Sequence, residues 1–145
     1  MKIATAADMH DLGKRIGAQC KAGDLILLNG PLGAGKTVLV QGIGQSLGIR
    51  DVTSPTFVIS RIHKAALPLI HVDAYRLLDG GKAALYLDHL DLDSPRESAV
   101  TVIEWGGEES ARLSEERLEI VIDRTNEVRE VTITPVGPRW QGLSV

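Results

Sequence analysis

The sequence lacks the features that mark a secreted or membrane-spanning chain. Its 145 residues include a single cysteine, Cys20, so no disulfide can form within the chain. No apolar run approaches the roughly 18 residues needed to cross a bilayer. No basic-then-apolar segment stands at the N-terminus, so we expect no signal peptide. These absences favour a protein of the reducing cytoplasm that has no membrane partner.

The sequence also lacks an excess of positive charge. Lys and Arg number 16 against 19 Asp and Glu, and the formal net charge is −3. That balance argues against a broad electrostatic surface for nucleic acid. Repeats, low-complexity segments and an interdomain linker are absent as well. With 43% apolar residues, a chain of this length suits one domain, residues 1–145, around one core.

A phosphate-binding sequence is the most informative feature that is present. Residues 30–37 read Gly-Pro-Leu-Gly-Ala-Gly-Lys-Thr, a complete G-x-x-x-x-G-K-[ST] loop. Its glycines let several backbone N–H groups point at one anion. Lys36 can reach the β- and γ-phosphates, and the Thr37 hydroxyl can ligate Mg²⁺. We therefore expect a nucleoside triphosphate to be bound by Leu32, Gly33, Ala34, Gly35, Lys36, Thr37 and Val38.

The residues around this loop have the pattern that such a loop requires. Residues 24–29, Asp-Leu-Ile-Leu-Leu-Asn, are typical of a buried strand entering the loop. Apolar residues at helical spacing follow over 38–47, and Gly48 is placed to end that helix. The helix therefore points its positive end at the phosphates. An earlier helix is predicted to begin at Thr5 and to close by Gly23.

The remaining β-rich segments predict the fold class. Strands are expected over 57–62, 67–72 and 99–103, and residues 118–123 and 128–134 alternate as a closing hairpin does. The order predicts an α/β fold: a three-layer, P-loop NTPase-like mixed sheet with helices on both faces and antiparallel strands near the C-terminus.

Two acidic residues follow predicted strands. Asp73 and Glu104 each end an apolar segment, and ligands of such sheets bind at the C-terminal edges of the strands. Phosphoryl transfer needs a carboxylate that holds Mg²⁺ or orients the attacking water. Because Mg²⁺ takes few protein ligands, Thr37 and one carboxylate suffice. The residues alone leave open which carboxylate does which.

A hydroxyl-rich loop follows the predicted phosphate-loop helix. Thr53, Ser54 and Thr56 lie where a nucleotide-sensing switch is found in other phosphate-loop proteins. A hydroxyl there could contact the γ-phosphate or its metal and let go after hydrolysis. An ordinary turn around Pro55 is the alternative.

Four motifs in this order resemble the bacterial TsaE family, also called YjeE. They are residues 33–37 (Gly-Ala-Gly-Lys-Thr), 54–57 (Ser-Pro-Thr-Phe), 71–77 (His-Val-Asp-Ala-Tyr-Arg-Leu) and 103–105 (Ile-Glu-Trp). The resemblance implies a Mg²⁺-dependent ATPase needed to form threonylcarbamoyladenosine in tRNAs that read codons beginning with adenine. It implies action on a TsaB–TsaD complex, contact with tRNA only through that complex, and no transfer of the threonylcarbamoyl group by this chain.

The resemblance also assigns roles to residues. It makes Lys36 the phosphate contact, Thr37 and Glu104 the Mg²⁺ ligands, and Asp73 the acid that acts on the attacking water. It places the switch at Thr53, Ser54 and Thr56. Where family members often carry a threonine facing adenine, the nearest match here is Met9.

Other functions fit the phosphate loop less well. A small-molecule P-loop kinase usually carries an arginine-rich lid, whereas the basic residues between Asp73 and Val100 are scattered. A regulatory GTPase usually carries an Asn-Lys-x-Asp loop, and that string is absent. A non-catalytic nucleotide-binding scaffold is the third alternative, against which the complete set of Lys36, Thr37, Asp73 and Glu104 argues.

Overall fold

The computed structural model describes most of the predicted elements. It covers residues 1–30, 35–49, 60–63, 67–73, 98–104, 116–124, 128–140 and 142–143, and at 60–63 and 73 only the backbone is considered. In chain order, the elements are β1 (Lys2–Ile3), α1 (Ala6–Gly17), β2 (Leu25–Asn29), α2 (Lys36–Ser46), β3 (Ser60–His63), β4 (Leu69–Asp73), β5 (Val100–Glu104), β6 (Arg117–Asp123), β7 (Arg129–Val136) and the short 3₁₀ turn η1 (Pro138–Trp140). None of the helices in these ranges is long and apolar enough to span a bilayer.

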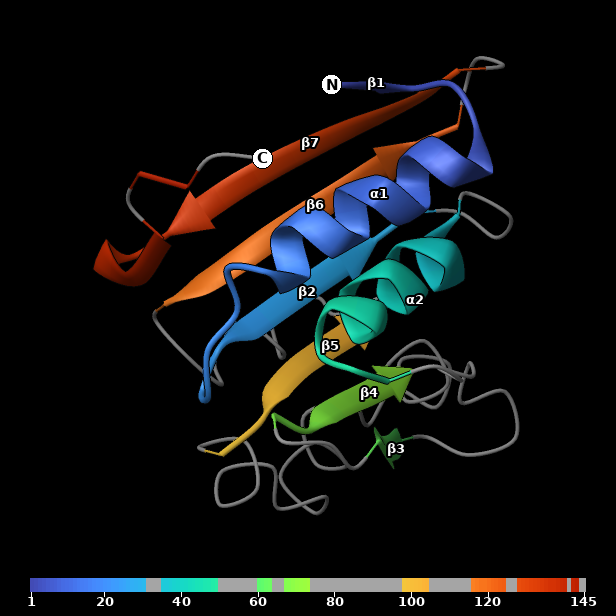
Figure 1. The fold of residues 1–145 in the computed structure, drawn as a ribbon. Coiled ribbons are helices and arrows are strands. Elements are labelled where there is room, and N and C mark those ends of the chain that lie inside the picture. The colour runs from blue at the N-terminus through green and yellow to red at the C-terminus, as the bar shows by residue number, and fades with distance from the viewer. Residues whose placement is uncertain are drawn as a thin grey trace, which may run out of the picture.

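The strands form one mixed sheet in the order β1-β7-β6-β2-β5-β4-β3 (Figure 1). The central strand β2 is parallel to both β5 and β6, and β4 is parallel to β5. At one edge of the sheet, β3 is antiparallel to β4. At the other edge, β7 is antiparallel to both β6 and β1. The predicted mixed α/β sheet with antiparallel strands near the C-terminus is confirmed.

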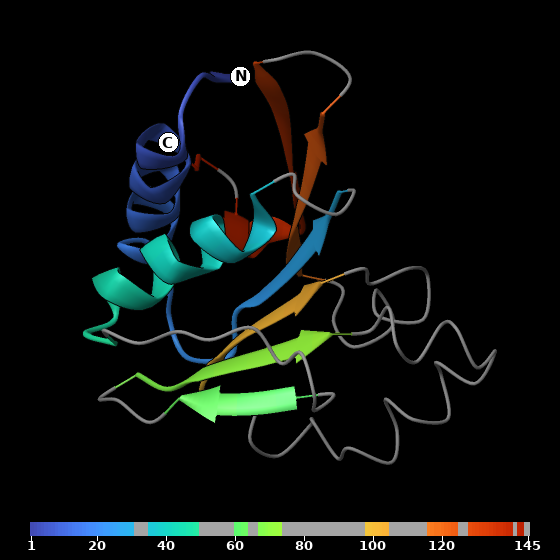
Figure 2. The ribbon, with the colours of Figure 1, turned by 90° about the vertical axis from the view of Figure 1, so that its right-hand side faces the viewer.

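The sheet is buried on both faces around its centre. Ile26 and Leu28 of β2 pack in the same cluster as the apolar side chains of α1 and α2, and both helices lie on one side of the sheet (Figure 2). Leu25 and Leu27 alternate with them along the strand and are also buried. This double burial is typical of a central parallel strand. No helix in the described ranges covers the second face, and the prediction of helices there concerns residues outside those ranges.

Local rules set the ends of the two helices. The Thr5 hydroxyl accepts a hydrogen bond from the Asp8 N–H at 3.1 Å, which confirms the predicted start of α1. The prediction that α1 closes by Gly23 set its end too late, because the helix stops at Gly17 and Gly23 belongs to the turn before β2. Gly48 follows α2 with φ of 84°, in the left-handed region that glycine adopts readily, as predicted.

The two helices touch backbone to backbone at glycines. A Cβ added at Gly13 of α1 would lie 2.2 Å from the Leu39 carbonyl oxygen of α2. A Cβ at Gly42 of α2 would lie 2.1 Å from the His10 carbonyl oxygen of α1. These distances leave no room for a side chain at the crossing. The position of α1 over the phosphate-loop helix therefore depends on glycine at both residues.

The 3₁₀ turn η1 is joined by an ion pair to the turn between α1 and β2. The Arg139 guanidinium donates from Nε to Oδ1 of Asp24 at 2.9 Å and from a terminal nitrogen to Oδ2 at 2.8 Å. It also lies 4.3 Å from the ring centre of Trp140, which is buried in the core. Asp24 is 4% exposed, so its carboxylate in this bidentate ion pair is almost fully shielded from water. The contact lies at the N-terminal end of β2, opposite the end that enters the phosphate loop.

Cys20 lies beside this ion pair and is not a reactive thiol. Its sulfur packs against the core and donates to the Ile16 carbonyl oxygen. Burial raises the pKa of the Cys20 thiol to about 12, and the Asp24 carboxylate acts in the same direction while Arg139 opposes it. The thiol therefore stays neutral near pH 7 and behaves as a small apolar side chain.

The glycine crossing yields a stability prediction. We expect Gly42→Ala to lower the free energy of unfolding by about 2 kcal/mol, because overpacking outweighs the gain of about 1 kcal/mol in helix propensity. Urea unfolding followed by circular dichroism measures the change. Gln45→Ala, at an exposed position of the same helix, is the matched control and is expected to stay within about 0.5 kcal/mol of the parent. A Gly42→Ala variant more stable than the parent contradicts the proposed packing.

Candidate functional site

The carboxyl ends of three parallel strands meet at one edge of the sheet. In the β2–β5 register Leu28 lies opposite Glu104, and in the β4–β5 register Asp73 lies opposite Glu104. The chain leaves β2 at Asn29 and enters the phosphate loop directly. The start of that loop and the backbones of Asp73 and Glu104 therefore share one edge, the place where such sheets bind ligands.

Lys36 begins α2 and lies inside this edge. Its residue is 6% exposed, and its Nζ donates to the Gly30 carbonyl oxygen at 2.5 Å. Gly35 caps the helix with φ of 104°, which is in the left-handed region where an L side chain is strained. The backbone can thus turn sharply from loop to helix, and the first N–H groups of α2 point back toward the loop. A buried ammonium group and a helix N-terminus together suit an anionic ligand.

Glu104 is the acidic group of the site whose side chain is described. It is 5% exposed, and its Oε2 accepts a hydrogen bond from Nε2 of the fully buried His71. Among the described residues no other hydrogen bond reaches this carboxylate. Carboxylate and hydroxyl oxygens are hard ligands of the kind that Mg²⁺ prefers, so Glu104 and Thr37 fit that ion by their chemistry.

His71 was missed as a functional residue by sequence reasoning. In the sequence it is the first residue of the motif at 71–77, and that motif predicts no role for it. One signal was present: His71 stands two residues before Asp73, the predicted catalytic acid, in the same strand β4. What the sequence did not show is that Glu104 of the neighbouring strand lies within hydrogen-bond reach.

Several predicted site residues fall outside the described residues. This applies to part of the phosphate loop and to the whole predicted switch, namely Leu32, Gly33, Ala34, Thr53, Ser54 and Thr56. Thr37 is the second residue of α2 and is half-buried. For Asp73 the backbone position alone is available. The roles assigned to all of these residues stay predictions.

A hollow of about 260 Å³ lies beside the phosphate-loop helix. Its lining is mostly apolar and comes from the start of α1, from α2 and from β7: Ile3, Ala4, Thr5, Ala6, Met9, Gly35, Val38 and Arg129. Met9 approaches Gly35 so closely that a Cβ there would lie 3.3 Å from the Met9 methyl carbon. The size is slightly below the roughly 300 Å³ at which small-molecule sites begin, and an apolar lining suits a flat base.

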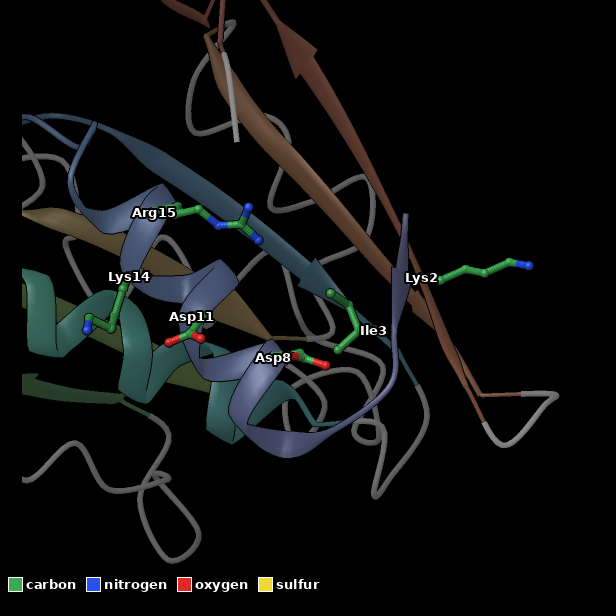
Figure 3. A pocket seen from close by; sticks show the side chains of 6 residues that line it. All are labelled: Lys2, Ile3, Asp8, Asp11, Lys14 and Arg15. Atoms are coloured by element: carbon green, nitrogen blue, oxygen red, sulfur yellow. The ribbon is translucent and has the colours of Figure 1, made fainter.

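A larger hollow of about 610 Å³ lies on the outer side of α1, next to β1 (Figure 3). Its lining side chains carry both signs of charge, with Asp8 and Asp11 next to Lys14 and Arg15. Lys2 points away from the helix (Figure 3). Because these charges do not converge on one point, this surface is not built for a phosphate.

Comparisons with known proteins agree with this geometry. A family model described as threonylcarbamoyl adenosine biosynthesis protein TsaE matches residues 3–131. The chain is 48% identical to the tRNA threonylcarbamoyladenosine biosynthesis protein TsaE of Streptomyces coelicolor, over 94% of this chain and 97% of that protein. It is 40% identical to the protein of the same name from Bacillus subtilis, over 91% and 82% respectively.

A solved structure shares the fold. The crystal structure of Bacillus subtilis YdiB superposes with a TM-score of 0.77 at 32% identity, and the match covers 97% of this chain and 87% of that one. Residues 3–131, which match the family model, include α1, the phosphate-loop helix and the central strands. The chain belongs to the TsaE family.

Proposed function

We propose that this chain binds ATP with Mg²⁺ at the carboxyl edge of its sheet and hydrolyses the ATP in support of threonylcarbamoyladenosine formation in tRNA. The observation that carries the proposal is the convergence of the ends of β2, β4 and β5, with Lys36 and Glu104 both buried there. Burying a charged side chain is costly, and Lys36 and Glu104 each offset part of that cost with a hydrogen bond inside the protein. A nucleoside triphosphate supplies negative phosphate oxygens for Lys36, and its metal ion supplies positive charge for Glu104.

The phosphate loop and α2 supply the positive side of the site. Backbone N–H groups of residues 32–37 and the positive end of α2 receive the phosphate oxygens. Lys36, which donates to the Gly30 carbonyl in the structure, exchanges that neutral acceptor for the β- and γ-phosphates. The new hydrogen bonds join two charged groups and are therefore stronger than the one they replace.

The acidic residues supply the other side. Thr37 and Glu104 would hold Mg²⁺, and the charge of the bound ion would neutralise the phosphate oxygens. Asp73 orients a water molecule whose oxygen attacks the γ-phosphorus. The bond from that phosphorus to the bridging oxygen breaks, ADP leaves with the bond's electrons, and the water's proton passes to Asp73 or to the departing phosphate. In this proposal the hydroxyls of Thr53, Ser54 and Thr56 sense whether the γ-phosphate is present.

The base lies in the hollow beside α2. Its apolar lining, with Met9 against Gly35, offers a surface for a purine ring next to the phosphate loop. Val38 lines the same hollow, one helical position beyond Thr37. In this proposal the base and the phosphates of one nucleotide lie on either side of the turn from the loop into α2.

The relatives indicate the pathway. Each is named a tRNA threonylcarbamoyladenosine biosynthesis protein, and we assign this chain the accessory ATPase role in the cytoplasm. Its ATP turnover acts on a TsaB–TsaD complex and resets it, and tRNA is contacted only through that complex. The threonylcarbamoyl transfer is not its own reaction. These names favour that role over a small-molecule P-loop kinase.

Lys36→Ala tests the phosphate site. We expect phosphate release from ATP to fall at least about 100-fold, because one charged donor to the reacting phosphoryl group is lost. The measurement is phosphate release with TsaB and TsaD present. Lys14→Ala, an exposed position on α1, serves as the matched control and should leave the rate unchanged. Near-normal release from Lys36→Ala would refute the site.

Asp73→Asn tests the role of the second carboxylate. Because the amide cannot accept the proton of water, we expect kcat to fall at least about 100-fold. The Kd for ATP should change little, since Asp73 touches no phosphate in this mechanism. Single-turnover hydrolysis and equilibrium titration with a fluorescent ATP analogue give the two values. An equal loss in both would mean that Asp73 does not act on the water.

Capture on the partner complex tests the pathway assignment. We expect immobilised chain to retain purified TsaB and TsaD, and retention to depend on whether ATP or ADP is present. Sedimentation or pull-down with each nucleotide measures this. Absence of capture under both conditions, together with ATP-dependent phosphorylation of a small metabolite, would instead identify a kinase.

A further inference from the structure

We propose that His71 is a positioning residue that holds the Glu104 carboxylate in the orientation needed to ligate Mg²⁺. The inference rests on the proposed function, which makes Glu104 a metal ligand. It adds a residue on β4 whose side chain touches neither nucleotide nor metal. Its chemistry is that of a hydrogen-bond donor which satisfies one carboxylate oxygen and leaves the other for the ion.

The two side chains meet across a strand pair that cannot adjust easily. In the parallel register His71 lies opposite Val102, and Glu104 is two residues further along β5 on the same face. His71 is fully buried and Glu104 nearly so. Central strands with both faces packed leave few other rotamers. The hydrogen bond from Nε2 of His71 to Oε2 of Glu104 therefore fixes the plane of the carboxylate.

The bond pattern defines how the histidine is used. A bond to the carboxylate requires hydrogen on Nε2, and Nδ1 has no hydrogen-bond partner in the described part of the chain. Such a histidine orients Glu104 through one N–H group and keeps Oε1 open to a cation. An arginine here would occupy both oxygens.

The buried setting explains why orientation matters. Without a donor from β4, the Glu104 carboxylate would be a nearly dry anion with no hydrogen bond from the described residues, and it would turn toward water. Each turn away from the phosphate edge must be reversed before a metal can bind. Outer partners of metal ligands commonly contribute about 10- to 100-fold to metal affinity through this effect.

The test measures metal affinity rather than turnover. Mn²⁺ replaces Mg²⁺ as the probe, and electron paramagnetic resonance counts free Mn²⁺ in the presence of the full chain and a non-hydrolysable ATP analogue. We expect His71→Leu to weaken Mn²⁺ binding about 10-fold or more. We expect His71→Gln to bind nearly as the parent does, because its amide nitrogen reaches the place of Nε2. Nucleotide affinity in EDTA should be the same in all three proteins.

Two controls separate this inference from the proposed function. If Glu104→Gln binds Mn²⁺ as the parent does, the metal assignment itself fails. If Glu104→Gln is weakened while His71→Leu is not, the assignment stands and the positioning role of His71 is wrong. Should His71→Leu lose metal-free nucleotide binding or fail to fold, His71→Gln decides: parental Mn²⁺ affinity supports the role, and a loss as large as that of Glu104→Gln overturns it.

Discussion

The parallel register of β2, β5 and β4 is the constraint on which the site depends. It brings residues far apart in the chain to the same level, so that Leu28, Glu104 and Asp73 lie in one row across three strands. Each strand then ends at the same edge. A shift by one residue in either pair would turn Glu104 to the other face of the sheet, because side chains alternate along a strand. The burial of both faces opposes such a shift.

The two helices beside this row of residues are packed closely against each other. The backbone contact between Gly13 and Gly42 brings α1 onto α2, and the same helices form the walls of the hollow beside Gly35. The ion pair between Arg139 and Asp24 joins η1 to the residue before β2. It therefore fixes the end of β2 opposite the phosphate loop.

The electrostatics of the edge follow from burial. Lys36 donates to a backbone carbonyl and Glu104 accepts from His71, so each charged group is satisfied locally. Hydrogen bonds that join two charged groups are stronger than those in which one partner is neutral. A ligand that brings phosphate oxygens to one and a divalent cation to the other can replace or extend these bonds. On this basis we propose a ligand that carries both signs of charge.

Sequence reasoning was most reliable where the physics is local. The cap at Thr5, the stop at Gly48, the strand before the phosphate loop and the β6–β7 hairpin all depend on neighbouring residues. It was less reliable at the ends of the elements. β1 has two residues, too few for any periodicity, and α1 ends at Gly17, earlier than predicted.

By itself, the sequence determined the strand and the helix on either side of the glycine-rich motif and predicted a phosphate site there, since each needs only residues close in the chain. It could also place acids at the ends of two later strands. Only the tertiary structure decided that Glu104 would lie beside His71, and that Gly13 would meet Gly42. Those contacts depend on strand order, register and helix crossing, which arise from packing among distant segments and leave no pattern in the local sequence.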